Sequence, residues 1–342
     1  MIRGCLALLA TLFLAGMILT GAFVWDAFLA SPASGTTPVS FVINKGESVK
    51  VISERLQEEG LLESAKFFTV YVWLTGTQAD FQSGLFSLEP GLNFRALVSA
   101  LTSAKAQEVQ VTFPEGYTLK NMEQILSASF SDFSAESWGR ATGVESELFA
   151  AGTHVLSGIP QGQGLEGYLF PDTYRFSASA TSDIIAETMV LTLKRRLSEA
   201  GVVIPDDLIM ANGLTFHEML TLASIVEKEA ATPEDMKIVA DIFLTRLEIG
   251  MALQACSTVN YLTGKNDPAV SAEDQAIVSP YNTYQVMGLP PGPISNPGMN
   301  AILAVLEPTP TVYLYFLTTQ QGEMKYAQTY DEHVANKQKY LK

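Results

Sequence analysis

Apolar and polar residues alternate over residues 39–43, the period-two pattern of a strand with one buried face, and residues 84–88 also have strand character. Apolar residues at helical spacing lie between these two strands and after the second. The pattern predicts, in order, a strand at 39–43, a helix from Ser48 to Gly60, a helix at 66–74, a strand at 84–88 and a helix from Asn93 to Leu101. We therefore expect a small α/β subdomain over residues 39–105.

The first helix of this subdomain has clear start and stop signals. Ser48 is a residue type that caps helix N-termini, and Gly60 is typical of a helix end. Val51, Ile52 and Leu56 are spaced to share one helix face. We expect these three side chains to pack into the core.

A larger region follows, in which helices and strands are mixed. The pattern predicts a strand at 109–113, helices at 119–127, 145–150, 183–200, 216–230 and 233–249, strands at 312–317 and 325–328, and a helix at 330–340. Ile185, Met189, Leu193 and Leu197 recur at helical spacing, so we expect them on one buried face. The sequence therefore predicts a domain over residues 109–342 and an α+β fold class.

The N-terminus contains an apolar run long enough to span a membrane. Residues 6–24 carry no charge over 19 positions, and about 20 apolar residues cross a bilayer as a helix. Arg3 before the run favours a cytoplasmic N-terminus at residues 1–5. Residues 25–38 would be a linker. A cleaved signal peptide is the alternative, and both interpretations place the rest of the chain outside the cytoplasm.

Composition narrows the function classes. The chain has 36 acidic residues against 21 basic ones and no basic run, so nucleic acid is not an expected partner. Its two cysteines do not form a disulfide framework. Its three histidines lie far apart without zinc-type spacing, and no glycine-rich phosphate loop is present. We expect neither a metal nor a cofactor.

One acid stands in unusual surroundings. The helix at 216–230 is apolar on two faces, so most of it should be enclosed. Glu227 lies near its end, where the small residues Ala223 and Ser224 would leave room for a ligand. A carboxyl group in apolar surroundings has a raised pKa and can donate a proton near neutral pH. The alternative is a helix whose Glu-Lys-Glu end emerges into water.

Two further regions suit a sugar ligand. Residues 165–174 combine aromatic side chains with two acids, a composition that matches sugar rings and their hydroxyls. Residues 279–284 lead into residues 288–298, where four prolines stiffen the backbone and could position substrate. The alternatives are a Pro-Asp turn beside core aromatics and a purely structural loop.

Residues 253–259 form a fourth candidate segment. Gln254 and Thr258 offer hydrogen-bonding groups to a substrate. Cys256 has no histidine near it in the sequence, so we do not expect a thiol nucleophile.

These segments occur together, in this order, in the YceG-like (MltG-type) family of endolytic murein transglycosylases, which the chain resembles from near Phe41 to its C-terminus. The matching strings are Glu-Gly-Tyr-Leu-Phe-Pro-Asp-Thr-Tyr at 166–174, Ala-Ser-Ile-Val-Glu-Lys-Glu at 223–229, Tyr-Asn-Thr-Tyr at 281–284 and Gly-Leu-Pro-Pro-Gly-Pro-Ile at 288–294. The resemblance implies one transmembrane helix in the inner membrane, a small LysM-like subdomain and a larger extracytoplasmic catalytic domain of mixed α+β type.

The resemblance also implies an activity. Such enzymes cleave the MurNAc–GlcNAc β-1,4 bond without water, leave a 1,6-anhydro-MurNAc end, and act in strand termination beside peptidoglycan synthases. The family's catalytic glutamate falls on Glu227, with Glu229 as an alternative. The residues expected to bind the glycan strand are Glu166, Tyr168, Asp172, Tyr174, Glu229, Gln254, Thr258, Asn282, Thr283 and Tyr284.

The chain departs from the family pattern at one place. The family usually has Asp-Pro where this chain has Cys256 and Ser257, so an acid beside the site is missing. This departure leaves open a weakened or non-catalytic glycan-binding scaffold on a membrane tether. A hydrolase that uses water is a second rival.

Overall fold

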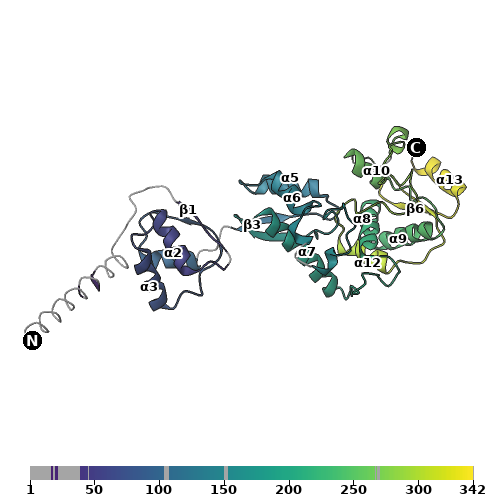
Figure 1. Cartoon of the computed structure of the whole chain (residues 1–342). Coiled ribbons are helices and arrows are strands. Elements are labelled where there is room, and N and C mark those ends of the chain that lie inside the picture. Colours follow the sequence, from purple (N-terminus) through teal and green to yellow (C-terminus); the bar gives the residue numbers. More distant parts are fainter. Residues whose placement is uncertain are drawn as a thin grey trace, which may run out of the picture. The chain divides into compact units, whose positions relative to one another are not determined.

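The computed structural model describes residues 17, 20–21, 39–44, 46–103, 108–149, 153–265, 267 and 270–341 (Figure 1). The chain divides into two compact units. One takes in the described residues up to Gln110 together with Arg175–Ala180, and the other Val111–Tyr174 together with Thr181–Lys342. The domain limits drawn from the sequence, 39–105 and 109–342, stay predictions.

The first unit has the order of elements that its sequence predicts. Its elements are β1 (Val39–Ile43), α2 (Val49–Glu58), α3 (Ala65–Thr75), β2 (Gly84–Leu88) and α4 (Phe94–Ser103). The strands β1 and β2 are antiparallel, with Phe41 opposite Phe86. Phe41 and Phe86 both lie in the core of the unit, together with apolar residues of the three helices.

The caps of this unit are as expected, with one correction in the core. The Ser48 side chain accepts a hydrogen bond from the Val51 amide and starts α2. Ile52 and Leu56 are fully buried, but Val51 is 42% exposed. Residues 52 and 56 lie one turn apart on the inner face, whereas residue 51 is rotated about 100° from residue 52 and faces outward.

The second unit is built mainly from helices. Its helices are α5 (Leu119–Ser129), α6 (Ala135–Thr142), α7 (Ser182–Glu199), α8 (Phe216–Glu229), α9 (Pro233–Glu248), α10 (Cys256–Thr263), α11 (Ala272–Gln275), α12 (Met299–Leu306) and α13 (Tyr330–Tyr340). Among its short strands, β5 (Tyr315–Thr318) pairs with β6 (Met324–Ala327). The strands β3 (Glu108–Thr112) and β4 (Thr173–Ser177) pair with each other, and the limit between the two units falls within each of them. The mixed α+β class predicted from the sequence is confirmed.

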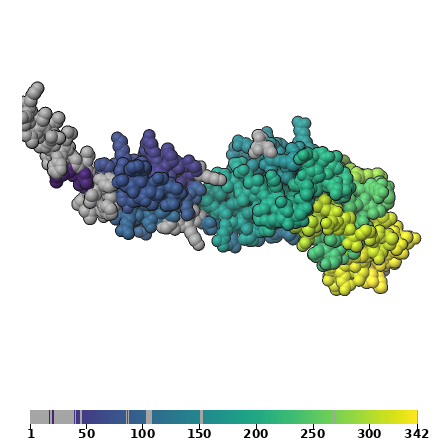
Figure 2. All heavy atoms as spheres, turned by 90° about the horizontal axis from the view of Figure 1, so that it is seen from below, coloured from purple at the N-terminus to yellow at the C-terminus, as the bar shows by residue number. Residues whose placement is uncertain are grey.

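The helix α8 lies at the centre of this unit and packs against α9, α10 and α12 (Figure 1). Thr215 caps it, and Glu218 completes a capping box with the Thr215 backbone. Ten of its residues are buried, which explains why its sequence is apolar on more than one face. At the C-terminus, α13 packs on β5 and β6, and Figure 2 shows these residues, in yellow, gathered on one part of the unit's surface.

Several elements differ from the predicted ones. The expected helix at 145–150 is only the 3₁₀ turn Glu147–Phe149, and α6, α10, α11 and α12 were not predicted. The strand expected at 312–317 begins at Tyr315, and Val312 is 68% exposed. Apolar content alone therefore overestimated that strand's length and burial. On α7, by contrast, Ile185, Met189, Leu193 and Leu197 are buried as expected.

The predicted segments at residues 1–5, 6–24 and 25–38 lie outside the described residues, apart from positions 17, 20 and 21. Among the helices that the structure describes, none combines the length and the apolar character needed to cross a membrane.

Candidate active site

Glu227 lies in the last turn of α8 and is partly buried. The amide N–H of Gly298 donates to its Oε2 at 2.9 Å. Burial raises the pKa of Glu227, and the negative charge of Glu115 adds to this effect, while the Gly298 hydrogen bond and the charge of Lys228 offset only part of it. Glu227 is therefore biased toward its protonated form.

The loop before α12 is fastened to α8 one turn before this acid. The Ile294 amide donates to Ser224 Oγ at 3.0 Å, and Ser295 Oγ donates to the Ser224 carbonyl oxygen at 3.2 Å. Ser224 and Ser295 are both fully buried. The expectation that Ser224 leaves room for a ligand is therefore wrong, because the loop fills that space and carries Gly298 to Glu227.

A second turn, at residues 114–117, lies against the same acid. The Gly116 amide donates to the Asn296 carbonyl oxygen at 2.9 Å, and the Asn296 amide donates to the Tyr117 carbonyl oxygen at 2.9 Å. A Cβ atom at Gly116, whose φ is +72°, would lie 3.4 Å from Cγ of Glu227. The sequence indicated only the end of a strand here, so Glu115 and Gly116 were missed.

Glu166 accepts hydrogen bonds that connect α5 to the 294–298 loop. Its two carboxyl oxygens accept from the Leu119 amide at 3.1 and 3.2 Å, and Asn296 Nδ2 donates to Oε1 at 2.9 Å. Burial raises the pKa of Glu166 to about 8 against these hydrogen bonds. Asn296 is fully buried, and its Oδ1 accepts from the Leu169 amide at 2.9 Å. Glu166 and Asn296 thus tie α5, residues 166–169 and the 294–298 loop together.

The other residues expected from the 166–174 segment lie elsewhere. Tyr168 is fully buried, and its hydroxyl lies 2.9 Å from His217 Nδ1. The Tyr174 hydroxyl donates to the Phe170 carbonyl oxygen at 2.7 Å within the core. Asp172 forms an ion pair with Arg196. The structure therefore gives these three side chains packing and bracing contacts rather than placing them beside Glu227.

Glu229 faces a different partner from Glu227, although the two acids are close in sequence. The amide and the hydroxyl of Ser257 both donate to Glu229 Oε1, at 3.0 and 2.7 Å. Burial raises the pKa of Glu229, and these bonds and the charge of Arg246 offset only part of the effect. The resemblance drawn from the sequence implies a proline at the position of Ser257, and a proline there would have no amide hydrogen to donate.

The remaining predicted binding residues build the loop around α10. Thr258 and Thr283 are fully buried, and their hydroxyls lie 2.9 Å apart. Asn282 is fully buried, and its Nδ2 donates to the Ile277 carbonyl oxygen at 2.8 Å. The Tyr284 hydroxyl lies 3.2 Å from Cys256 Sγ. The side chains of these four residues therefore contact other parts of the same loop and stabilise its conformation.

Gln254 is the exception in this loop. Its side chain is exposed, and its φ is +48°, in the left-handed region that few residues other than glycine adopt. Its amide donates to the Thr283 carbonyl oxygen at 3.0 Å, which holds this conformation. Such strain persists only where the surroundings enforce it, and it is common at functional sites.

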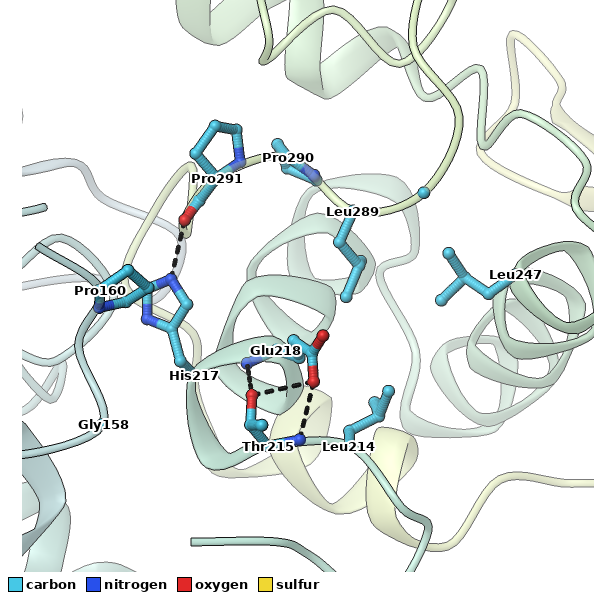
Figure 3. Close-up of a pocket in the computed structure, with 11 residues that line it drawn as sticks. Gly158, Pro160, Leu214, Thr215, His217, Glu218, Leu247, Leu289, Pro290 and Pro291 are labelled. Carbon is cyan, nitrogen blue, oxygen red and sulfur yellow. Dashed lines mark hydrogen bonds between the residues drawn. The ribbon is translucent and has the colours of Figure 1, made fainter.

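A separate hollow of about 540 Å³ lies at the other end of α8. Figure 3 shows Thr215, His217 and Glu218 on one side of it and the Leu289–Pro291 segment on the other. His217 Nε2 donates to the Pro291 carbonyl oxygen at 2.8 Å. The Glu218 carboxylate is held by Thr215. The polar groups labelled here therefore mainly brace the protein, and Glu227 is not part of the lining.

Comparison with known proteins identifies the family. A model of the YceG-like family matches residues 41–339. The chain belongs to the YceG-like family. The resemblance inferred from the four motifs is thereby confirmed, and the match spans both described units.

Two curated relatives and one solved structure extend this result. The chain is 34% identical to a Bacillus subtilis (strain 168) protein named endolytic murein transglycosylase, over 95% of this chain and 91% of that protein. It is 31% identical to a Streptococcus pneumoniae serotype 2 protein of the same name, over 92% of this chain and 60% of the longer relative. The crystal structure of a protein described as YceG-like from Listeria monocytogenes matches with a TM-score of 0.59 and 29% identity, over 88% of this chain and 99% of that one.

Proposed function

We propose that this YceG-like chain is an endolytic murein transglycosylase in which Glu227 is the general acid and base. One observation carries the proposal. The Gly298 amide donates a hydrogen bond to Oε2 of Glu227, while no described residue donates one to Oε1. Oε1 can therefore face a substrate oxygen. The raised pKa of Glu227 favours the protonated carboxyl group, which donates the proton in the first step.

The reaction begins with proton transfer from Glu227 to the glycosidic oxygen as the C1–O bond breaks. Positive charge develops at C1 of the muramic sugar in an oxocarbenium-like transition state. The Glu227 carboxylate then removes the proton from the sugar's own 6-hydroxyl, and that oxygen bonds to C1. One carboxyl group serves both steps, and the internal nucleophile gains from proximity.

The surrounding residues position this acid. Ser224 holds the 294–298 loop, and Gly298 fixes the orientation of the Glu227 carboxyl group. Asn296 and Glu166 brace the loop from behind. Of the predicted binding residues, Gln254 is exposed and its backbone is strained, so we propose it as a contact to the glycan strand.

The proposal includes a location. The uncharged run at residues 6–24 supports a single-pass anchor in the inner membrane with the catalytic domain outside the cytoplasm, next to peptidoglycan and its synthases. The strand–helix–helix–strand order of β1, α2, α3 and β2 supports a LysM-like subdomain. N-terminal sequencing of the protein from a membrane fraction would test the anchor, because a cleaved signal peptide would give a new N-terminus after residue 24.

Digestion of purified sacculi tests the activity. The full-length protein should release muropeptides with 1,6-anhydro-MurNAc ends, identified by mass spectrometry. In water enriched in heavy oxygen the new ends should carry no label. Labelled reducing ends would instead show a hydrolase, and absence of any new ends would show a glycan-binding scaffold.

A further inference from the structure

We propose that Glu115 is an electrostatic positioning residue for the acid, because its carboxyl group lies beside Gly298, the residue whose amide donates to Glu227. The inference rests on the proposed function and adds a second residue to it. The sequence motifs did not indicate Glu115, which follows Pro114 in the turn after β3.

Gly298 defines the geometry of the pair. Its amide donates to Glu227 Oε2 at 2.9 Å. A Cβ atom added at Gly298 would collide with Oε1 and Cδ of Glu115. Both carboxyl groups therefore contact the same residue. The φ of Gly298 is −77°, a value that any residue adopts, so glycine is needed here for space and not for backbone conformation.

Backbone bonds fix the position of Glu115. Tyr117 and Asn296 form an antiparallel bridge, and the Gly116 amide also donates to Asn296. Glu115 immediately precedes these anchored residues, and its side chain is exposed. The main chain next to Glu115 is therefore anchored to the loop that carries Gly298.

Two charged side chains, Glu115 and Lys228, act on the pKa of Glu227. Burial is the largest influence on its pKa and raises it, the charge of Glu115 raises it further, and the charge of Lys228 lowers it. Lys228 Nζ lies 3.4 Å from the Gly116 carbonyl oxygen, so the same turn holds this cation as well. Removing the charge of Glu115 should leave burial, the Gly298 hydrogen bond and Lys228 acting on Glu227, so the pKa of Glu227 should fall.

The test is the pH profile of kcat/KM for release of anhydro-muropeptides from soluble glycan strands by the full-length protein. The high-pH limb of this profile reports loss of the proton from the general acid. Glu115→Gln should move that limb toward lower pH by about 0.5–1 unit, the shift expected from a nearby like charge that is partly exposed to solvent. Activity at low pH, where Glu227 is protonated in both proteins, should be nearly unchanged.

Two matched variants separate this effect from others. Glu115→Asp keeps the charge, so its high-pH limb should stay near that of the unchanged protein. Glu145→Gln removes an exposed charge that is not among those acting on Glu227, so it should not move the limb. Thermal melting of each variant checks that it is folded.

The proposal is overturned if Glu115→Gln leaves the limb in place, or if activity falls by the same factor at every pH, which would indicate direct contact with substrate. If Glu115→Gln fails to fold, Glu115→Asp decides instead, because a shifted limb in that charge-retaining variant would contradict the inference. Failure of the proposed function looks different, since the unchanged protein would then release no anhydro ends at all.

Discussion

The last turn of α8 carries two acids, Glu227 and Glu229, that face two different regions of the same unit. Glu227 faces the 114–117 turn and the 294–298 loop, where one main-chain amide holds one of its oxygens. Glu229 faces the start of α10, where Ser257 donates twice to a single oxygen. Burial raises the pKa of both acids. The two therefore share a perturbed pKa but differ in what surrounds the carboxyl group.

This difference shows that a raised pKa alone does not mark a catalytic acid. Glu166 makes the point most strongly, because burial raises its pKa to about 8 while hydrogen bonds from Leu119 and Asn296 occupy its oxygens. Perturbed groups also occur in structural networks. In this protein, Glu166 differs from Glu227 because both of its oxygens accept hydrogen bonds. Glu229 differs from Glu227 because its partner is Ser257 of α10 rather than the 294–298 loop.

The largest expected effect comes from exchanging acid for amide at each of the two positions on α8. Glu227→Gln should lower the rate of anhydro-muropeptide release by about 10²- to 10⁴-fold, the range for loss of a general acid. Glu229→Gln should lose far less activity, because the amide oxygen still accepts from Ser257. The measurement is mass spectrometry of sacculus digests over time, with thermal melting of both variants.

Thermal melting also serves as the control for this pair. Both variants should unfold cooperatively, since Gln keeps the size and the acceptor oxygen of Glu. An active Glu227→Gln protein, or an inactive but folded Glu229→Gln protein, would reverse the assignment of the two regions.

The sequence predicted the elements that carry the two acids better than their partners. α8 was predicted to within one residue, because a long apolar segment is a local signal. β1 and β2 were predicted at the observed limits for the same reason. Ser257 as the partner of Glu229, and Gly298 and Glu115 as the neighbours of Glu227, were not predicted. These contacts join residues 28 or more positions apart, and no local periodicity reports them.

Burial of aromatic residues was misjudged for a related reason. Tyr168 and Tyr174 were expected at a sugar site because aromatic rings bind sugars. The structure buries both rings and pairs both hydroxyls within the protein. Composition cannot tell a ring that packs in the core from one that faces ligand, because either ring is apolar with a polar end. α12 was missed because Gly298 before it was taken as the end of a stiff loop.

The second-largest expected effect concerns Glu166, and it is a change in how the stability of the protein depends on pH. The folded-state pKa of Glu166 is about 8, above its ordinary value of 4.5, so the folded protein keeps a proton that the unfolded chain releases. Stability from this group is present below about pH 4.5 and is lost as pH rises toward 8, by at most about 1.4 kcal/mol per unit. Glu166→Gln should therefore flatten the fall in melting temperature between about pH 5 and pH 8.

Glu166→Gln keeps an oxygen that can accept from Leu119 and Asn296, so the fold should be retained. Some slope should remain, because burial also raises the pKa of Glu227 and Glu229. The measurement is differential scanning calorimetry across this pH range. An unchanged slope in the variant would show that Glu166 does not hold a proton in the folded state. Glu166 would then not share the raised pKa of Glu227 and Glu229.

The smallest expected effect compares two serines, one for each region. Ser257→Ala removes the hydroxyl that donates to Glu229 but keeps the amide bond, so the free energy of unfolding in urea should fall by about 1 kcal/mol with little change in kcat. Ser224→Ala removes the acceptor of the Ile294 amide and so loosens the loop that carries Gly298. Its loss of stability should be similar or larger, and kcat should fall as well. If Ser257→Ala lowered kcat as much as Ser224→Ala does, the α10 region would contribute to catalysis, and the distinction between the two acids would need to be redrawn.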